Sequence, residues 1–380
     1  MSGPNTADVV VIGGGIAGVS AAYQLASTHR VVLLEREPQL AHHTTGRSAA
    51  VYIVNYGGPI AMRLTIASRS FFDEPPDGLA DHPMLEPRGV LMVGDESQRA
   101  QIESLAAEGR ALDPSIGLID GEAARSMVPV LREEAAVVGM FEPGGSTMDV
   151  MGIHQAFVRG AVQNQATVHR HKGAIGIERR GSGWRVRTTD DVFDTETIVN
   201  AAGAWGDHVA ELAGVAPVGL TPMRRTAFTV ASDIDSAAWP LVHVDSADGP
   251  CYFKPEAGNQ LLCSPSDEIA SEACDARPEE LDIARAIERI NAATTLDIRA
   301  IKSSWAGLRT FSPDRQPVIG MDSELPGFCW MVGQGGTGIT TSFASGQVVG
   351  AVVRGEALPP ELTDLGLDAE DLGPNRLQRG

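Results

Sequence analysis

The stretch DVVVIGGGIAG, residues 8–18, decides the fold that this sequence predicts. Residues 8–12 are dominated by β-branched side chains, which is typical of a parallel strand buried on both faces. Glycines follow at once, residues 19–27 have the pattern of a helix, and residues 30–34, RVVLL, predict a second strand. The segment is therefore a complete strand–helix–strand unit of about 30 residues.

The glycines of this unit have the G-x-G-x-x-G spacing of a dinucleotide-binding turn. Gly13 permits the tight turn, Gly15 lets a pyrophosphate approach the backbone, and Gly18 lets the helix pack on the strand. The start of the helix then offers free N–H groups to the phosphates. Glu35 ends the second strand, where its carboxylate can accept hydrogen bonds from a ribose diol and would repel the 2′-phosphate of NADP. A glycine-rich turn that merely packs a helix would leave Glu35 unexplained.

Composition and charge exclude several classes of partner. The chain has 380 residues, of which 43% are hydrophobic, and its 30 basic and 49 acidic residues give a net charge of -19. Such a field repels nucleic acid and anionic membranes, so we expect neither nucleic-acid binding nor stable membrane insertion. The sequence shows no export signal and no apolar run of 18 residues, which predicts a cytoplasmic protein. Its four cysteines form no C-x-x-C pair, so we expect reduced thiols and no metal site.

Further along the chain, strand–helix segments at the start, middle and end flank stretches of antiparallel-strand pattern. The strands TAFTV, PLVHV, CYFKP and QLLCS fall between residues 224 and 264, and a further glycine-rich turn covers residues 333–338. A nicotinamide enzyme does not need that last turn, whereas a flavin held along its whole length does, so we expect FAD. Residues beyond about 360 read as a polar tail. The predicted class is α/β, with a Rossmann-like FAD-binding domain (1–88, 144–218 and 305–380) and an inserted antiparallel-sheet substrate domain (89–143 and 219–304).

Four further motifs make a resemblance to a known family specific. HHTTGRSAA begins at His42, VNAAGAW ends at Trp205, WAGLR ends at Arg309, and VGQGGTGITTS ends at Ser342. Together with the first glycine turn and its acid, they resemble the D-amino-acid oxidase superfamily of flavoproteins over almost all of the chain. Within that superfamily the sequence is most similar to the FAD-dependent D-arginine dehydrogenase type.

The resemblance implies which residues bind the cofactor. The first glycine turn would face the pyrophosphate and Glu35 the ribose, while the last glycine turn would bring backbone N–H groups to the isoalloxazine ring, where negative charge develops on reduction. Arg36 and Ala174 would lie near the adenine, and Arg47, Ser48 and Ala49 near the flavin. The whole implied set is Gly13, Gly15, Ile16, Ala17, Gly18, Glu35, Arg36, Arg47, Ser48, Ala49, Ala174, Ala202, Gly203, Gly335, Gly336, Gly338 and Ile339.

The resemblance also implies a catalytic set that holds the α-carboxylate of a small amino acid or amine substrate. Arg225 and Arg309 match positions that clamp the carboxylate, which a guanidinium grips with two parallel bonds. Tyr56 and Tyr252 match hydroxyls near the same group. The alternative for Arg225 is a surface or structural ion pair, whereas Arg309 follows a buried-looking WAGL and a buried arginine demands an anion.

Other polar residues are expected to play no part in catalysis. We interpret Arg224 as a solvated surface charge. We interpret His42, His43 and His82 as polar groups of loops.

The sequence departs from the arginine type in the substrate pocket. Val90 stands where those relatives have a glutamate for the guanidinium, and Val51 and Ile53 replace a histidine and a threonine. Thr337 replaces a tyrosine of the last glycine turn. A cationic side chain would be buried there without a partner, at a cost of several kcal/mol. The pocket therefore predicts a neutral or apolar substrate side chain and poor oxidation of D-arginine.

The predicted activity is oxidative deamination of a D-amino acid to an imino acid, by hydride transfer from Cα to flavin N5. Two alternatives remain open. One is a flavin enzyme of the same fold that acts on an N-methyl amino acid, a cyclic amino acid or a hydroxy acid. The other is a flavoprotein without turnover. The sequence identifies no electron acceptor and leaves both an oxidase and a dehydrogenase open, although the resemblance favours a dehydrogenase.

Overall fold

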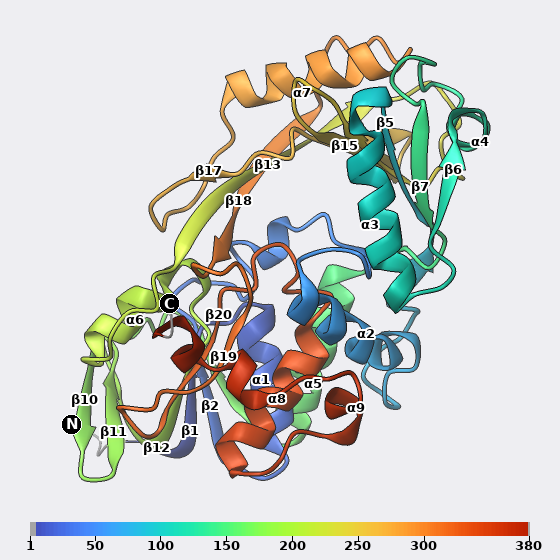
Figure 1. The fold of residues 1–380 in the computed structure, drawn as a ribbon. Helices are drawn as coiled ribbons and strands as arrows, with labels where there is room; N and C mark the ends of the chain where they lie inside the picture. Colours follow the sequence, from blue (N-terminus) through green and yellow to red (C-terminus); the bar gives the residue numbers. More distant parts are fainter. Residues whose placement is uncertain (1–4, 379–380) are drawn as a thin grey trace.

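A computed structural model describes residues 5–378 as two large sheets with helices packed on each, and one small sheet between them (Figure 1). The first sheet is built around β1 (Asn5–Ile12), which pairs in parallel with β2 (Val31–Leu34) on one side and β12 (Val192–Asn200) on the other. Parallel pairing continues to β9 (Thr167–His169) and β20 (Phe328–Val332). The antiparallel strands are β10 (Gly176–Arg180), β11 (Gly183–Arg187) and β19 (Val318–Met321).

Helices cover both faces of this sheet because side chains alternate along β1. Val9 and Val11 point to a core shared with the helices, and Val10 and Ile12 point to the opposite core. The first face carries α1 (Ile16–Ala26), α2 (Pro59–Asp73), α5 (Val150–Gln163) and α8 (Ser342–Arg354). The second face carries α6 (Gly206–Leu212), next to the 3₁₀ turn η3 (Gly203–Trp205) and the hairpin of β10 and β11.

The second sheet is mostly antiparallel and lies above the first sheet and its helices in the view of Figure 1. Its strands are β5 (Val90–Gly94), β6 (Gly117–Asp120), β7 (Val138–Glu142), β13 (Thr221–Ala231), β14 (Leu241–Asp245), β15 (Cys251–Glu256), β16 (Gln260–Ser264), β17 (Ile269–Ala270) and β18 (Ser303–Phe311). The 3₁₀ turn η2 (Glu96–Gln98) leads into α3 (Arg99–Leu112), and α4 (Gly121–Met127) and α7 (Glu280–Ala293) complete this part. Helix α7 buries Ile283, Ala286 and Ile290, three and four residues apart, against the sheet.

A small third sheet lies where the two parts meet. It consists of β3 (Val51–Tyr52), β4 (Leu85–Pro87) and β8 (Ser146–Met148). Nearby, the 3₁₀ turn η1 (Thr45–Arg47) links the parts: Thr44 Oγ1 donates to Leu308 O of β18 at 2.7 Å, and Trp305 Nε1 donates to Arg47 O at 2.9 Å.

The α/β class is confirmed, and two expectations about the chain's organisation differ from the structure. The predicted boundary between residues 304 and 305 falls inside β18, which pairs with β13 over its whole length and so belongs to the second sheet. The expected polar tail was wrong. Residues 360–378 form α9 (Pro360–Thr363), α10 (Ala369–Leu372) and the 3₁₀ segment η4 (Pro374–Gln378), and Leu362, Leu367 and Leu372 are buried in the first core.

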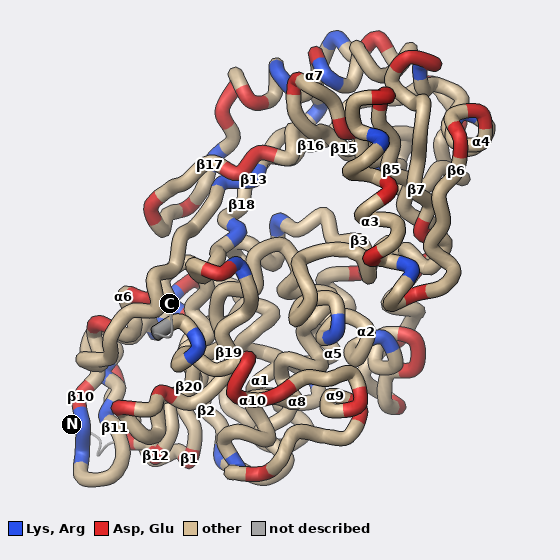
Figure 2. The backbone as a smooth tube through the Cα atoms, in the orientation of Figure 1, with Lys and Arg blue, Asp and Glu red and all other residues tan. Residues whose placement is uncertain are grey.

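Charged residues are spread over both parts of the fold. Acidic and basic positions are interspersed along α7 and scattered over both parts (Figure 2). Between residues 5 and 378, no helix combines the length and the apolar character that crossing a bilayer requires. All four cysteines are free thiols, and Cys274 is the exposed member of the four.

Candidate active site

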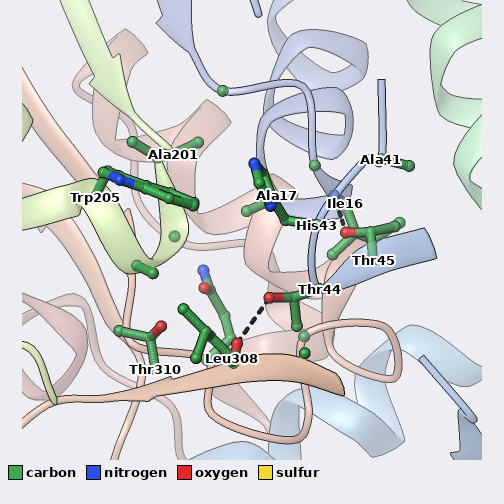
Figure 3. A pocket seen from close by; sticks show the side chains of 18 of the residues that line it. Ile16, Ala17, Ala41, His43, Thr44, Thr45, Ala201, Trp205, Leu308 and Thr310 are labelled. Atoms are coloured by element: carbon green, nitrogen blue, oxygen red, sulfur yellow. Dashed lines mark hydrogen bonds between the residues drawn. The ribbon is translucent and has the colours of Figure 1, made fainter. Parts of the chain in front are cut away.

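The first glycine turn forms the floor of the site at the carboxyl end of β1, where ligands of open α/β sheets bind. Gly13 has φ +112°, and a Cβ there would lie 2.4 Å from Ala201 O, so glycine is required. A Cβ on Gly18 would lie 1.8 Å from Gly13 O, so Gly18 lies beneath the turn and allows close packing of α1. The backbone N–H of Ile16 donates to Thr45 Oγ1 at 3.0 Å (Figure 3).

Glu35 is buried just after the end of β2, and its carboxylate holds the first glycine turn in place. Its Oε2 accepts from Gly14 N at 2.7 Å and its Oε1 accepts from Glu37 N at 2.8 Å. On the other side of the turn, the buried His154 of α5 approaches Gly14 O at 3.0 Å through Nε2. Burial lowers the pKa of His154 despite the hydrogen bond to that carbonyl, so the ring is neutral near pH 7 and Nε2–H is the donor.

A cavity of about 280 Å³ runs from this turn to the second sheet. It contains nearly the whole predicted cofactor set; among those residues only Gly18 does not line it. Predicted members that line it are Gly13, Gly15, Ile16, Ala17, Glu35, Arg36, Arg47, Ser48, Ala49, Ala174, Ala202, Gly203, Gly335, Gly336, Gly338 and Ile339. The sequence analysis did not single out Gln334, whose Nε2 is buried in the cavity wall without a hydrogen-bond partner among the described residues. An unsatisfied donor there fits a cofactor with polar ring atoms.

Aromatic and basic side chains line the part of the cavity near the end of β2. The Arg36 guanidinium lies 3.7 Å from the Trp205 ring centroid. The His43 ring packs on the same ring, with 4.7 Å between the centroids; Figure 3 labels both residues. His42 and His43 therefore line the cavity, whereas His82 lies at the surface beside Asp149. No sequence motif marked Trp205 as more than the end of a strand-to-helix turn.

Glu37, His42 and His43 could bring ligand atoms within 4.8 Å of one another, the spacing of a metal site. The guanidinium of Arg36 already contacts two of them, at 3.0 Å from Glu37 Oε1 and 3.4 Å from His43 Nε2. A metal ion would meet that fixed positive charge, so we assign no metal to this cluster.

The four predicted substrate-binding side chains converge at the opposite end of the cavity. In the β13–β18 pair Arg225 faces Gly307 and Met223 faces Arg309, so the two arginines are diagonal neighbours on one face of the sheet. Arg309 Nη1 donates to Tyr56 Oη at 2.9 Å. Tyr252 lines the cavity with both arginines, whereas Tyr56 reaches Arg309 from outside the cavity lining.

The two arginines differ in their electrostatic environment. Burial, followed by the positive charge of Arg309, lowers the pKa of Arg225. Burial alone would lower the pKa of Arg309 too, but the hydroxyls beside it and the Glu268 carboxylate raise it above the ordinary value. Arg225 Nε is buried without a partner among the described residues. The pair therefore has unused donors and an excess of positive charge, which suits a carboxylate ligand.

His243 is a neighbour of this cluster that the sequence analysis missed. It faces Tyr252 across the β14–β15 pair and carries a buried Nδ1 with no hydrogen bond in the described structure. Burial and the nearby Arg225 charge lower its pKa although Asp245 opposes them. In the sequence His243 is a single histidine in the strand pattern LVHV, and nothing in that pattern indicates that it lies beside the arginines.

Three of the four predicted pocket residues lie together beside the clamp, but none of the four lines the cavity. Val51 and Val90 belong to an apolar cluster with Tyr252, and Ile53 packs against it. Its other members are Ala227, Leu241 and Leu262, with Ala49 and Trp305 packed on it. Thr337 lies elsewhere: its Oγ1 donates to Gln334 O at 2.9 Å, and it packs against Gly57.

Two arginines have partners that the sequence analysis did not foresee. Arg224 is not a solvated charge, because its guanidinium is largely buried and pairs with Glu279 and Asp282 of the α7 region. Arg47 lines the cavity, but its guanidinium points to the junction of the two parts. There it pairs with Asp275 and donates to Ala276 O and to a carbonyl of β18.

Comparison with known proteins identifies the family. Residues 8–352 match the family described as DAO, FAD dependent oxidoreductase. This chain belongs to that family. Its cofactor is accordingly FAD, and the cavity described above offers residues that suit this cofactor.

Two similar proteins of known activity differ in length. Mouse (Mus musculus) sarcosine dehydrogenase is 28% identical over 368 residues; the match covers 90% of this chain but 39% of that much longer protein. Glycine oxidase from Geobacillus kaustophilus is 24% identical over 360 residues, covering 91% of this chain and 93% of the oxidase.

Among solved structures, L-proline dehydrogenase from P. horikoshii superposes with a TM-score of 0.86, at 21% identity and 99% coverage of both chains. The structure of the Geobacillus glycine oxidase gives 0.81, at 20% identity and coverage of 93% and 95%. These structures share the fold. The finer resemblance to the D-arginine dehydrogenase type stays a prediction.

Proposed function

We propose that this protein oxidises the Cα–N bond of a D-amino acid with a neutral or apolar side chain, to an imino acid that hydrolyses in water. The observation that carries the proposal is the clamp: Arg225 and Arg309 lie side by side at the end of the cofactor cavity, with the hydroxyls of Tyr56 and Tyr252 beside them. Bound FAD supplies the hydride acceptor.

The protein's own residues do the positioning. Two guanidiniums fix the α-carboxylate, so that Cα–H is presented toward the cavity rather than toward the sheet. Gly336 makes this close approach feasible, because a Cβ there would lie 2.9 Å from Tyr56 Oη and 3.0 Å from Arg309 Nη1. No strong base is needed, since the substrate amine can lose its proton to water before oxidation.

The apolar cluster supports the neutral side chain. Val51, Val90 and Leu262 offer no charge or hydrogen bond to a guanidinium or ammonium group. Glu142 faces Val90 across the β5–β7 pair, but it is fully buried and accepts from Val54 N at 2.6 Å and from the next backbone N–H. A cationic substrate would be desolvated without a free partner there.

A substrate panel tests the proposal. Purified holoenzyme is assayed with D- and L-enantiomers of leucine, methionine, phenylalanine, arginine and lysine, using an artificial electron acceptor beside an oxygen electrode. We expect the D-forms of the apolar amino acids to give the highest kcat/KM. Faster turnover of D-arginine or D-lysine would refute the pocket argument, and faster turnover of the L-forms would refute the assigned configuration.

Secondary amines are a second candidate substrate class. A relative at 28% identity is named for sarcosine, and a structure with the same fold is named for proline. The carboxylate clamp serves such substrates equally well. Sarcosine and both enantiomers of proline therefore belong in the same panel, and a kcat/KM for either above that of every primary amino acid would favour this class.

A further inference from the structure

One carboxylate of the chain itself already sits on the substrate clamp. Glu268, in the loop between β16 and β17, accepts from Arg225 Nη2 at 3.1 Å through Oε1. Its other oxygen, Oε2, accepts from Arg315 Nη2 at 2.8 Å. The Arg225 side chain is 12% exposed and that of Glu268 is 33% exposed. The clamp is therefore part of a three-residue ion-pair chain that runs from the site to the surface.

The structure holds Glu268 in place from both sides. Its neighbour Asp267 accepts from Thr226 N at 2.7 Å and from Thr226 Oγ1 at 2.9 Å, which ties the loop to β13. On the other side, the Arg315 guanidinium lies 3.9 Å from the ring centroid of Phe311, the last residue of β18. Acidic positions mark this loop around β17 in Figure 2. Glu268 is thus a fixed charge.

The charges around the clamp leave room for one anion. The Glu268 charge acts on both Arg225 and Arg309, and the Asp267 charge acts on Arg309. Together with Arg315, these are three guanidiniums and two carboxylates, which leaves one net positive charge. A single substrate carboxylate balances it. A second carboxylate would meet fixed negative charge on one side and the apolar cluster on the other.

We propose that Glu268 is a specificity-determining residue that limits the site to substrates with a single carboxylate. The inference deepens the proposed function and rests on the part of it that seats a carboxylate on Arg225 and Arg309. Removing the Glu268 charge would leave a further positive charge on the clamp, and a dianion gains more from that change than a monoanion does.

Unreactive carboxylates test this without turnover. Butyrate and succinate have the same number of carbons and differ by one carboxylate, and their binding to the holoenzyme is read from the perturbed flavin absorbance. We expect Glu268→Gln, which keeps the shape and one acceptor, to raise the succinate-to-butyrate affinity ratio by about tenfold or more. The matched control is Glu272→Gln, an exposed acid just after β17, which should leave the ratio unchanged.

A second variant moves the charge the other way. Arg315→Gln removes a guanidinium that is half exposed and should lower the same ratio, by less than the Glu268 variant raises it. If Glu268→Gln does not fold, the Arg315→Gln variant provides the test, and an unchanged succinate-to-butyrate affinity ratio in that variant overturns the inference. An equal loss of both ligands in Glu268→Gln also overturns it, because that is the result of a merely structural role.

Turnover separates this inference from the proposed function. D-Asparagine and D-aspartate differ mainly by one carboxylate, and Glu268→Gln should raise the kcat/KM of aspartate relative to asparagine. If no amino acid reduces the flavin but the succinate-to-butyrate ratio still shifts, the proposed function fails and the role of Glu268 stands. If amino acids are oxidised and neither ratio shifts, the role of Glu268 fails and the proposed function stands.

Discussion

Replacing Arg309 by methionine would remove the guanidinium that anchors the clamp while keeping an unbranched side chain on β18. In the structure this guanidinium bonds Tyr56 Oη at 2.9 Å and lies beside Gly336 of the last glycine turn. A hydrogen bond between charged groups contributes about 1.5–3 kcal/mol, so losing one such bond to the substrate should lower kcat/KM by about 10- to 200-fold. Loss of two parallel bonds would lower it further.

The assay is steady-state turnover with an artificial acceptor, together with the flavin content from visible absorbance. Tyr56→Phe is the matched control, because it removes a neutral hydroxyl and leaves both arginines. Its effect should be about 2- to 13-fold. Since Tyr56 and Arg309 are in contact, the double variant should lose less than the sum of the two single losses in free energy. An Arg309→Met protein that retains FAD and turns over within twofold of the wild type would refute the assignment of Arg309 to the substrate site.

Three further variants test the cofactor site and the loop that carries Tyr56. Gly13→Ala should yield protein without bound flavin, seen as loss of visible absorbance, because its Cβ would clash with Ala201 O and its φ of +112° is strained. His154→Gln should make the free energy of unfolding in urea depend less on pH. Burial lowers the pKa of the His154 ring in the native protein, so the unfolded chain binds one proton more than the native protein at low pH. The stability of the wild type therefore falls as the pH drops below about 6.5. Identical pH profiles for the two proteins would contradict this. Glu142→Ala should lower the unfolding free energy by about 1–3 kcal/mol, measured in urea, because Val54 N–H loses its buried acceptor; an unchanged midpoint would show that water replaces the carboxylate.

Local sequence was sufficient to predict the first strand–turn–helix unit and the acid that follows it. The strand, turn and helix that begin with residues 8–18 depend on neighbouring residues only, and Glu35 sits one residue beyond the second strand. The roles of Gly13 and Gly18 follow from backbone geometry that other residues cannot adopt without a clash. The first glycine turn and Glu35 can therefore be predicted from one sequence, because they depend on residues close together in the chain.

Features that depend on distant partners were not predictable. Arg224 was expected to be solvated, but its acidic partners Glu279 and Asp282 come from a helix more than 50 residues later. In the sequence Glu268 is one acid of a polar loop. Its role depends on ion pairs with Arg225 and Arg315, which lie on different segments of the chain. The buried leucines after residue 360 are spaced five apart, which matches neither a helical nor a strand period, so the segment read as a tail.

The central position of β12 in the first sheet has a consequence for how the protein is made. β12 pairs with β1, near the start of the chain, and with β20, whose residues Phe328–Val332 are synthesised late. The flavin-holding half therefore cannot be completed while the ribosome is still translating the middle of the message, and the β1 edge waits for partners far along the chain. Nascent fragments that end before residue 328 would leave the carboxyl end of β12, from Ile198 to Asn200, without its β20 partner, and an unpaired strand edge favours aggregation.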